Sequence, residues 1–354
     1  MPTRLERFVA STFELELTIR EWIATLAHET LARCIGSASH LPSTTPGMTL
    51  SRQCIWFLLA LAASCSTPSE SAPGPVIDVH LHANAINAMN SRAIAEMTGL
   101  ACATTDEELF EKTLDAMLHS GVVLALVSGD HSLDWQTRAP DRLWAGARRT
   151  ESLRSIRRRI ESGSYRAIAE FAPQYDGLAP DDPSLEPFFA LAEELDVPLG
   201  IHMGPGPPGA AYRGTPGYRM GLSDPLLLED VLIRHPKLRL YVMHAGWPML
   251  DEMIGLLHAH PQVYVGLGVI DWALPAAEFH HYLARLVGAG YAGRILFGSD
   301  QMEAYGAIEA AIQRIRSADY LSEEQKRAIL YDNAARFLRL SEEEIARHHA
   351  LVAR

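Results

Sequence analysis

The feature that most constrains the fold is a regular alternation of strand-like and helix-like segments. Eight short apolar, β-rich runs lie at residues 76–80, 122–128, 143–147, 166–171, 198–202, 239–244, 263–267 and 294–298. Helical patterns separate them, at residues 106–119, 151–161, 184–195, 225–234, 250–258, 276–287 and 305–316. Strands that alternate with helices form parallel sheets through right-handed crossovers. Eight such units across residues 76–340 predict a single α/β domain, a (β/α)8 TIM barrel.

An open doubly wound sheet is the alternative architecture. It usually carries a glycine-rich phosphate loop after its first strand, and no GxGxxG motif follows residues 76–80. Hydrophobic residues make up 48% of the chain and charged residues 21%, which suits a large core and excludes global disorder. The net charge of −12 argues against a nucleic-acid partner.

An apolar run at residues 54–64 precedes the barrel. Its length is about 16 Å as a helix, too short to span a membrane but typical of the hydrophobic region of a signal peptide. Residues 48–65 resemble a bacterial lipoprotein signal, in which Cys65 would be lipidated, and residues 66–75 are typical of a flexible linker. We therefore expect a protein of the bacterial cell envelope, lipid-anchored or periplasmic, whose only membrane contact is the anchor. If the signal is not real, the expected location is the cytoplasm.

A signal peptide should begin at the N-terminus, yet 47 residues precede Met48. We hypothesise that translation starts at Met48 and that residues 1–47 are an extension of the gene model. The alternative is a genuine N-terminal helix at residues 13–33, followed by a buried apolar segment.

Imidazole and carboxylate groups stand where predicted strands end. His80 and His82 close the first strand, and because they are two residues apart their side chains share one face. His202 closes the fifth strand, His244 the sixth, and Asp300 follows the eighth. Strand ends of a barrel meet at one rim, which is where TIM-barrel active sites lie. Neutral imidazoles with a carboxylate are typical ligands of zinc and related divalent ions, so the sequence predicts a metal site at this rim.

This arrangement resembles the amidohydrolase superfamily, which has HxH on strand one, single histidines on strands five and six, and aspartate on strand eight. Surrounding motifs resemble its amidohydrolase-2 branch, which includes aminocarboxymuconate-semialdehyde decarboxylase. The resemblance covers residues 77 to about 340. The supporting stretches are IAEFAP at 168–173, AEELDVP at 192–198, LFGSD at 296–300 and DNAAR at 332–336.

The resemblance implies a role for each residue of the motif. His80, His82, His202 and Asp300 would bind one divalent ion, which we expect to be zinc. His244 would lie beside the ion and orient the substrate or polarise its carbonyl group. Asp300 would also accept the proton of the attacking water and pass it to the leaving group. The family often dimerises, so a homodimer is expected.

Lysine content bears on the number of ions. Many superfamily members hold two ions bridged by a carbamylated lysine on strand four, but Lys112, Lys237 and Lys326 all lie elsewhere. Glu170 does lie on strand four. It would either bridge two ions or accept a hydrogen bond from a ligand imidazole. The branch resemblance favours one ion.

A glycine- and proline-rich loop at residues 205–220 follows the fifth strand at the predicted rim. Arg213 and Arg219 could clamp a substrate carboxylate there, or could be exposed charges of a solvated loop. Trp247 is expected either to line the substrate pocket or to be a packing residue.

Two reactions suit this site. The first is metal-dependent hydrolysis of a small-molecule amide, lactone or ester. The second is non-oxidative decarboxylation of a small carboxylic acid. Predicted export favours hydrolysis, because the related decarboxylases are largely cytoplasmic. A metal-binding envelope lipoprotein without catalysis is a third hypothesis, although an open coordination position argues against it.

The C-terminal part is expected to be helical. Residues 321–340 predict one amphipathic helix that begins with a capping box at Ser322, and residues 341–354 predict another. We expect His348 and His349 in this last helix to lie at the surface.

Overall fold

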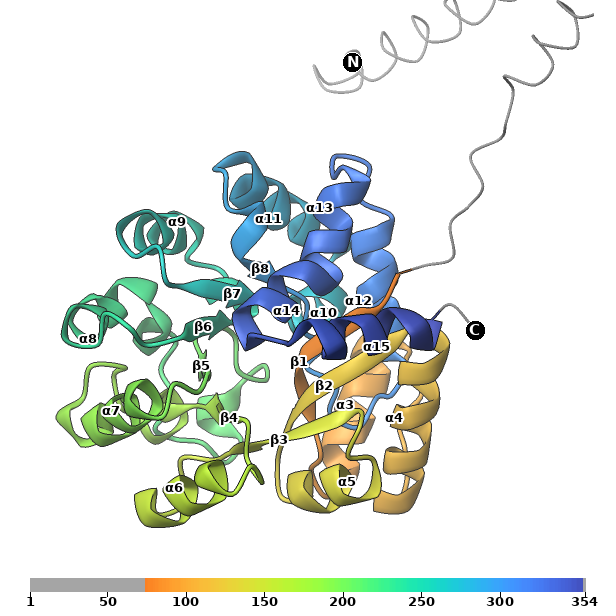
Figure 1. Cartoon of the computed structure of the whole chain (residues 1–354), viewed down its shortest axis with the longest axis horizontal. Helices are drawn as coiled ribbons and strands as arrows, with labels where there is room; N and C mark the ends of the chain where they lie inside the picture. Colours follow the sequence, from red (N-terminus) through yellow and green to blue (C-terminus); the bar gives the residue numbers. More distant parts are fainter. Residues whose placement is uncertain (1–73, 353–354) are drawn as a thin grey trace, which may run out of the picture. The chain divides into compact units, whose positions relative to one another are not determined.

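The computed structural model describes residues 74–352. Those residues form an eight-stranded parallel barrel surrounded by helices (Figure 1). The proposed extension at 1–47, the signal at 48–65 with Cys65, and the linker as far as residue 73 lie outside the described residues.

All eight predicted strands are present. In chain order they are β1 Val76–His82, β2 Val122–Ser128, β3 Leu143–Ala147, β4 Ala167–Phe171, β5 Leu199–His202, β6 Leu240–Met243, β7 Tyr264–Gly266 and β8 Ile295–Leu296. Each strand pairs in parallel with the next one along the chain. Backbone bonds between β1 and the segment after β8 bring the two ends of the sheet together: Val79 N–H donates to Phe297 O (3.0 Å) and Asp300 N–H to His80 O (2.6 Å). The TIM-barrel prediction is therefore confirmed.

The outer layer contains every predicted helix and three that the sequence analysis missed. The predicted ones are α4 Asp106–Ser120, α6 Leu153–Glu161, α7 Glu186–Glu194, α8 Glu229–Arg234, α9 Leu250–Ala259, α11 Ala276–Gly288 and α12 Ala307–Arg316. The additional ones are α3 Ala88–Thr98, α5 Ser132–Arg138 and α10 Ile270–Ala273. Helix α3 has recognisable ends, because the Asn87 side chain accepts hydrogen bonds from two backbone N–H groups and Gly99 ends the helix in the left-handed conformation.

Two hydrophobic layers hold the barrel together. The larger one lies between the strands and the surrounding helices. The smaller one fills the barrel itself and includes Ile77, Val79 and Tyr241. The Tyr241 hydroxyl donates to Val79 O at 2.9 Å. A Cβ at Gly200 would lie 2.4 Å from the Tyr241 ring, so only glycine leaves room for this side chain inside the barrel.

The C-terminal segment packs across one end of the barrel. The predicted helix at 321–340 is formed by α13 Glu323–Arg327, a π-helical turn η8 Ala328–Asp332, and α14 Asn333–Leu338. Its capping box at Ser322 is present. Phe337 and Leu338 join the cluster inside the barrel.

The last helix, α15 Glu342–Val352, also matches its prediction. The expectation that His348 lies at the surface is wrong. Its side chain is buried and its Nδ1 lies 3.0 Å from the Tyr331 hydroxyl. Because Tyr331 belongs to the cluster inside the barrel, this contact docks α15 against it.

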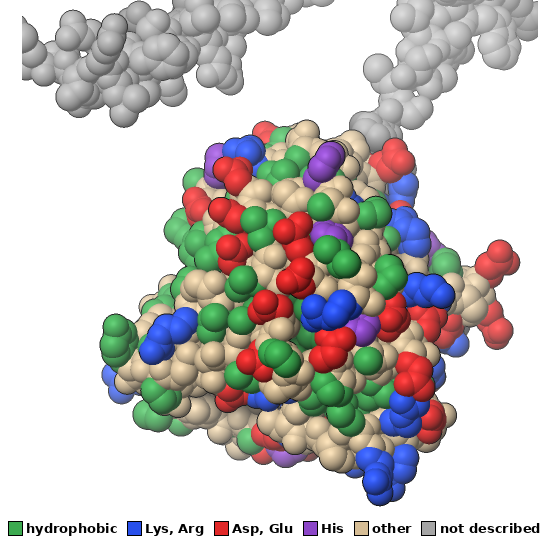
Figure 2. Space-filling model, turned by 90° about the vertical axis from the view of Figure 1, so that its left-hand side faces the viewer, with side chains coloured by type: hydrophobic (Ala, Val, Ile, Leu, Met, Phe, Trp, Pro, Cys, Tyr) green, Lys and Arg blue, Asp and Glu red, His purple; other side chains and the backbone are tan. Residues whose placement is uncertain are grey.

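No helix within residues 74–352 has the length and apolar character needed to cross a membrane. The face drawn in Figure 2 mixes acidic, basic and hydrophobic side chains.

Candidate metal centre

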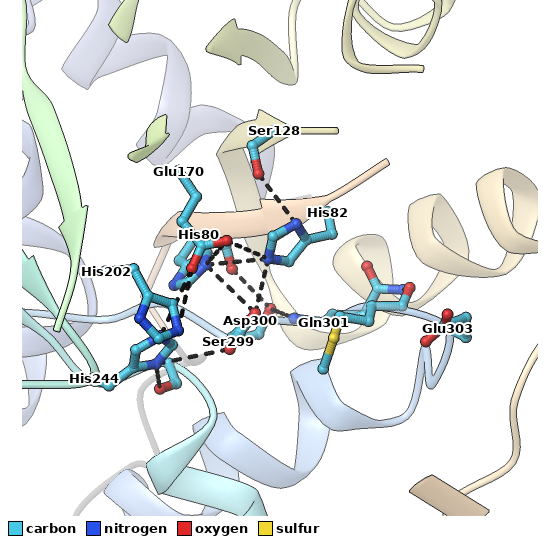
Figure 3. A network of polar contacts seen from close by, with 12 residues as sticks. His80, His82, Ser128, Glu170, His202, His244, Ser299, Asp300, Gln301 and Glu303 are labelled. Atoms are coloured by element: carbon cyan, nitrogen blue, oxygen red, sulfur yellow. Dashed lines mark hydrogen bonds and ion pairs between the residues drawn. The ribbon is translucent and has the colours of Figure 1, made fainter. Parts of the chain in front are cut away.

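The polar side chains that end the strands converge on one point of the barrel (Figure 3). On β1 the inward-facing Ile77 and Val79 are followed by His80 and His82. A regular strand would turn Val79 and His80 to opposite faces. The pairing of β1 with β2 is irregular between Asp78 and Leu81, and such a bulge re-aims the side chains that follow it.

Strand β4 has the same kind of irregular pairing as β1. Its pairing with β5 is irregular between Ile168 and Phe171. Ala169 belongs to the cluster inside the barrel, and the next residue, Glu170, carries its carboxylate into the candidate site. The bulge therefore places a carboxylate on the inner face directly after an inward alanine.

Three donor atoms form a compact triangle. His80 Nε2 lies 3.2 Å from His82 Nε2 and 3.4 Å from Asp300 Oδ1, and His82 Nε2 lies 2.8 Å from the same oxygen. Two ligand atoms of one tetrahedral zinc are separated by about 3.3 Å, given bonds of about 2.0–2.1 Å. The triangle therefore has the size of one face of a zinc coordination tetrahedron.

Glu170 lies between this triangle and the two remaining histidines. Its Oε2 is 3.5 Å from His82 Nε2, and its Oε1 is 3.6 Å from His202 Nε2 and 3.8 Å from His244 Nε2. The His202 and His244 rings are in contact, with centroids 4.3 Å apart. Strand-end residues far apart in sequence thus form one buried cluster, as the sequence analysis expected.

Surrounding groups fix the imidazole rings. The Ser128 hydroxyl is 3.1 Å from His82 Nδ1, and the Gly268 carbonyl is 2.8 Å from His244 Nδ1. A carbonyl oxygen only accepts, so Nδ1 of His244 carries a hydrogen and Nε2 is the ring nitrogen that faces the site. That orientation turns the metal-binding nitrogen of His244 towards Glu170.

Burial and charge set the protonation of the site. Burial alone would raise the pKa of Glu170, but the surrounding imidazoles, His202 foremost, hold it well below its ordinary value. Asp300 follows the same pattern, with its pKa lowered chiefly by the charges of His80 and His82 against the effect of burial. Burial lowers the pKa of His202 to about 3, and the neighbouring His244 adds to the shift. Burial would lower the pKa of His82, but its hydrogen bond to Asp300 and the charges of Asp300 and Glu170 raise it to about 9. The two carboxylates and His202 are therefore in the forms that bind a cation, while His82 would give up a proton to an ion bound here.

The cluster fits a divalent ion on its own geometry. His80, His82 and Glu170 offer one group of ligand atoms within 4.8 Å of one another, and Glu170, His202 and His244 offer another. His244 is 1% exposed and its Nε2 has no hydrogen-bond partner among the described residues. A buried ring nitrogen without a partner is costly, and a bound divalent ion would satisfy it.

The three expected substrate contacts lie in different surroundings. Arg219 helps to line a cavity of about 600 Å³ in the 205–220 loop, while its guanidinium donates to the carbonyls of Pro216 and Tyr218 at 2.7 Å each. Arg213 is exposed on the same loop. The Trp247 indole donates to Glu278 of α11 at 3.1 Å, and its partly buried ring packs against the larger hydrophobic layer.

Sequence reasoning missed two residues of the site. Asp78 is fully buried on β1 and accepts hydrogen bonds from His80 N–H (2.9 Å), Ser299 N–H (3.0 Å) and the Ser299 hydroxyl (2.6 Å). The Tyr175 hydroxyl, after β4, lies 3.3 Å from His202 Nε2. Asp78 carries a signal in hindsight, since a charged residue in the middle of an apolar strand needs buried partners. Nothing in the sequence around Tyr175 distinguishes it from a packing tyrosine.

An eight-stranded barrel with four imidazoles and two carboxylates at its rim defines a class, the TIM-barrel proteins with a candidate metal centre. A family model described as Amidohydrolase matches residues 77–340. The chain therefore belongs to the amidohydrolase family, in its amidohydrolase-2 branch, and the resemblance seen in the sequence is confirmed over the same residues. Members of this family are enzymes that act on small molecules.

Solved structures share the fold at low sequence identity. An uncharacterised TIM-barrel protein from Bordetella bronchiseptica is 18% identical, with a TM-score of 0.60 over 79% of this chain and 100% of that chain. An Acinetobacter baumannii protein described as a probable 2-pyrone-4,6-dicarboxylic acid hydrolase, solved with citric acid bound, is 14% identical, with a TM-score of 0.53 over 75% of this chain and 99% of that one. The 5-carboxyvanillate decarboxylase of Novosphingobium aromaticivorans, complexed with manganese and 4-hydroxy-3-methoxy-5-nitrobenzoic acid, is 14% identical, with a TM-score of 0.54 over 76% of this chain and 97% of that one. The comparison with curated proteins found no significant match.

Proposed function

We propose that this chain is a metal-dependent hydrolase of a small-molecule amide, lactone or ester. The observation that carries the proposal is the triangle of His80 Nε2, His82 Nε2 and Asp300 Oδ1, whose sides of 2.8 to 3.4 Å suit one tetrahedral zinc ion. Glu170 Oε2 lies close enough to join it, 3.5 Å from His82 Nε2. Imidazole and carboxylate donors favour zinc, although the same set also binds manganese.

A divalent ion bound here supplies Lewis acidity, which polarises the substrate carbonyl and makes water more acidic. The protein's own groups do the rest. Asp300 directs Oδ1 to the two histidines of β1 and Oδ2 towards the ring of His244, at 3.7 Å from Nδ1. Asp300 Oδ2 would take the proton from the attacking water and return it to the leaving nitrogen or oxygen.

Neighbouring groups prepare Asp300 for this role. The Asp300 backbone N–H donates to His80 O at 2.6 Å, which fixes the carboxylate relative to the β1 histidines. Its pKa is lowered by those histidines, so it is ionised and ready to accept a proton. The Tyr175 hydroxyl, 3.3 Å from His202 Nε2, is a hydrogen-bond donor placed to bind a substrate oxygen.

A second candidate, non-oxidative decarboxylation, is favoured by one observation. Arg219 lines the 600 Å³ cavity of the 205–220 loop, where a guanidinium could bind the carboxylate of a substrate. Its two bonds to loop carbonyls would have to break for it to do so. Arg213 and Trp247 are proposed as additional substrate contacts on the basis of the sequence.

The experiment is a substrate screen of the zinc-loaded full-length chain. Lactone, amide and ester panels are assayed for hydrolysis, and an aromatic-acid panel for released carbon dioxide. We expect turnover in the first group and a loss of at least a hundredfold in kcat for Asp300→Asn. Full turnover by Asp300→Asn with the metal retained would refute the proton-transfer role, and release of carbon dioxide without hydrolysis would establish the second candidate instead.

Export, lipidation of Cys65 and homodimer formation are proposals that rest on the sequence alone. Mass spectrometry of the native protein tests the first two. We expect a lipidated N-terminal Cys65, and peptides from residues 5–33 would contradict a start at Met48. Light scattering tests the dimer.

A further inference from the structure

The cavity of the 205–220 loop has a mainly apolar lining. Its volume of about 600 Å³ lies within the range of about 300–1,000 Å³ that is typical of small-molecule pockets. Four of its lining residues are prolines, which have no backbone N–H group to donate: Pro205, Pro207, Pro208 and Pro216. Tyr212, Tyr218 and Met220 add two aromatic rings and a thioether. The lining therefore suits an alkyl or aryl group.

Two polar side chains of the lining are already bonded within the loop. The Tyr218 hydroxyl donates to Gly204 O at 3.2 Å and accepts from Gly206 N–H at 2.7 Å. The Arg219 guanidinium donates to the carbonyls of Pro216 and Tyr218 at 2.7 Å each. A polar ligand group that used these atoms would have to break existing bonds, whereas an apolar group leaves them intact.

The cavity begins beside the metal centre. Gly206 lines it, and a Cβ at Gly206 would lie 3.2 Å from the Tyr175 hydroxyl. That hydroxyl is 3.3 Å from His202 Nε2. The rings of Tyr175 and Tyr218 are in contact, with centroids 5.3 Å apart. A molecule whose carbonyl group lies at the metal centre can therefore extend past Tyr175 into the cavity.

The segment after β4 holds the loop in place. Gln174 is 1% exposed, and its Nε2 donates to Gly204 O at 3.1 Å and to the Ser223 hydroxyl at 2.8 Å, one on each side of the loop. Gly217 packs directly on the same segment, because a Cβ there would lie 2.9 Å from the backbone carbon of Asp176. The cavity is thus formed before a ligand arrives, which lowers the entropic cost of binding.

We propose that this cavity binds an uncharged apolar arm of the substrate, an alkyl or aryl group attached to the ester, lactone or amide. The inference rests on the proposed hydrolase and deepens it, because it names the class of substrate. Arg219 then holds the loop together through its two carbonyl bonds and does not bind a substrate carboxylate.

The first test measures binding without reaction, on the zinc-loaded full-length chain. Straight-chain methyl ketones of four to eight carbons carry a carbonyl group but cannot be hydrolysed, and ligand-observed NMR titrations give their dissociation constants. We expect the affinity to rise about two- to fourfold with each added methylene group. An ether oxygen in the middle of the eight-carbon chain should weaken binding at least about fivefold, because the oxygen loses its water partners. Equal affinities across the series, or for the ether and the ketone, would overturn the proposal.

The second test uses a variant with a matched control. Tyr212 lines the cavity and is 93% exposed, so Tyr212→Ala leaves the core intact. It should bind the eight-carbon ketone at least about threefold more weakly than the wild type does, and the four-carbon ketone equally well. Tyr320→Ala removes a tyrosine beyond the end of α12, outside the loop, and should bind both ketones as the wild type does. Unchanged binding of the eight-carbon ketone by Tyr212→Ala would overturn the proposal.

The pocket and the hydrolase can fail separately. Ketone affinity that rises with chain length, without turnover of any ester, lactone or amide, would leave the pocket standing and refute the hydrolase. Hydrolysis with a kcat/KM that does not depend on the length of the apolar arm would do the reverse.

Discussion

Replacing Asp78 by alanine should destabilise the barrel more than most single changes. Asp78 is fully buried and accepts three hydrogen bonds, one from His80 within β1 and two from Ser299 that join β1 to the segment after β8. In Asp78→Ala the N–H groups of His80 and Ser299 lose their acceptor. The Ser299 hydroxyl has an alternative, because His80 O lies 3.5 Å away. An unpaired buried donor costs about 1–3 kcal/mol, so two of them cost about 2–6 kcal/mol.

That loss is a large share of the about 5–15 kcal/mol that stabilises a typical domain. Urea denaturation followed by circular dichroism measures it as a lower midpoint with an unchanged slope. Asp78→Asn is the matched control, because its amide oxygen can still accept from both backbone groups, and it should cost less than about 2 kcal/mol. The same variants report on the metal, since Asp78 aligns the backbone of His80 with Ser299, the neighbour of Asp300. A loss below about 1 kcal/mol in Asp78→Ala, with zinc affinity unchanged, would refute this reasoning.

Two other predictions concern the rim and the C-terminal helix. In Gly204→Ala the new Cβ would lie 2.5 Å from His244 Cβ, so the imidazole must move. We expect calorimetry to show at least a tenfold loss of metal affinity in this variant. The control is Gly221→Ala, whose new Cβ meets no atom within 4 Å and which should bind the metal as the wild type does. Equal affinities in the two variants would contradict the role of this close approach. Burial lowers the pKa of His348 to about 4, with a contribution from Arg347. Between pH about 6.5 and 4 the unfolded chain therefore binds more protons at this residue than the folded protein does. The free energy of unfolding is thus highest above pH 6.5 and decreases as the pH falls through this range. We expect a decrease of about 1–2 kcal/mol after allowance for solvent screening. The fall should be absent from His348→Gln in urea titrations at pH 7 and pH 5, and an equal fall in both proteins would show that His348 is not its cause.

The sequence predicted the barrel because each of its strands is short, apolar and followed by a helix. It also predicted that the histidines of β1, β5 and β6 would meet Asp300, since parallel strand ends share one rim. It could not place Glu170 between two pairs of imidazoles. Ala169 and Glu170 are neighbours on β4, and both face inward where the pairing with β5 is irregular, between Ile168 and Phe171. A bulge of this kind depends on the neighbouring strand and leaves no period in the sequence.

Other misses have a similar physical origin. Helix α3 carries a cap at Asn87 and a terminator at Gly99, but only Ile94 among its residues is buried, so its hydrophobic periodicity is weak. His348 lies in a charged stretch typical of an exposed helix. Its burial follows from contact with Tyr331, which a pattern confined to residues 341–354 does not contain.

The most direct test of the metal centre at the barrel rim is anomalous scattering from crystals of the zinc-loaded chain. We expect a zinc peak about 2.0–2.2 Å from His80 Nε2, His82 Nε2 and a carboxylate oxygen of Asp300, with Glu170 completing the site. Zinc bound elsewhere, with this triangle of side chains left empty in the same crystal, would contradict the claim that the rim of the barrel is a metal centre.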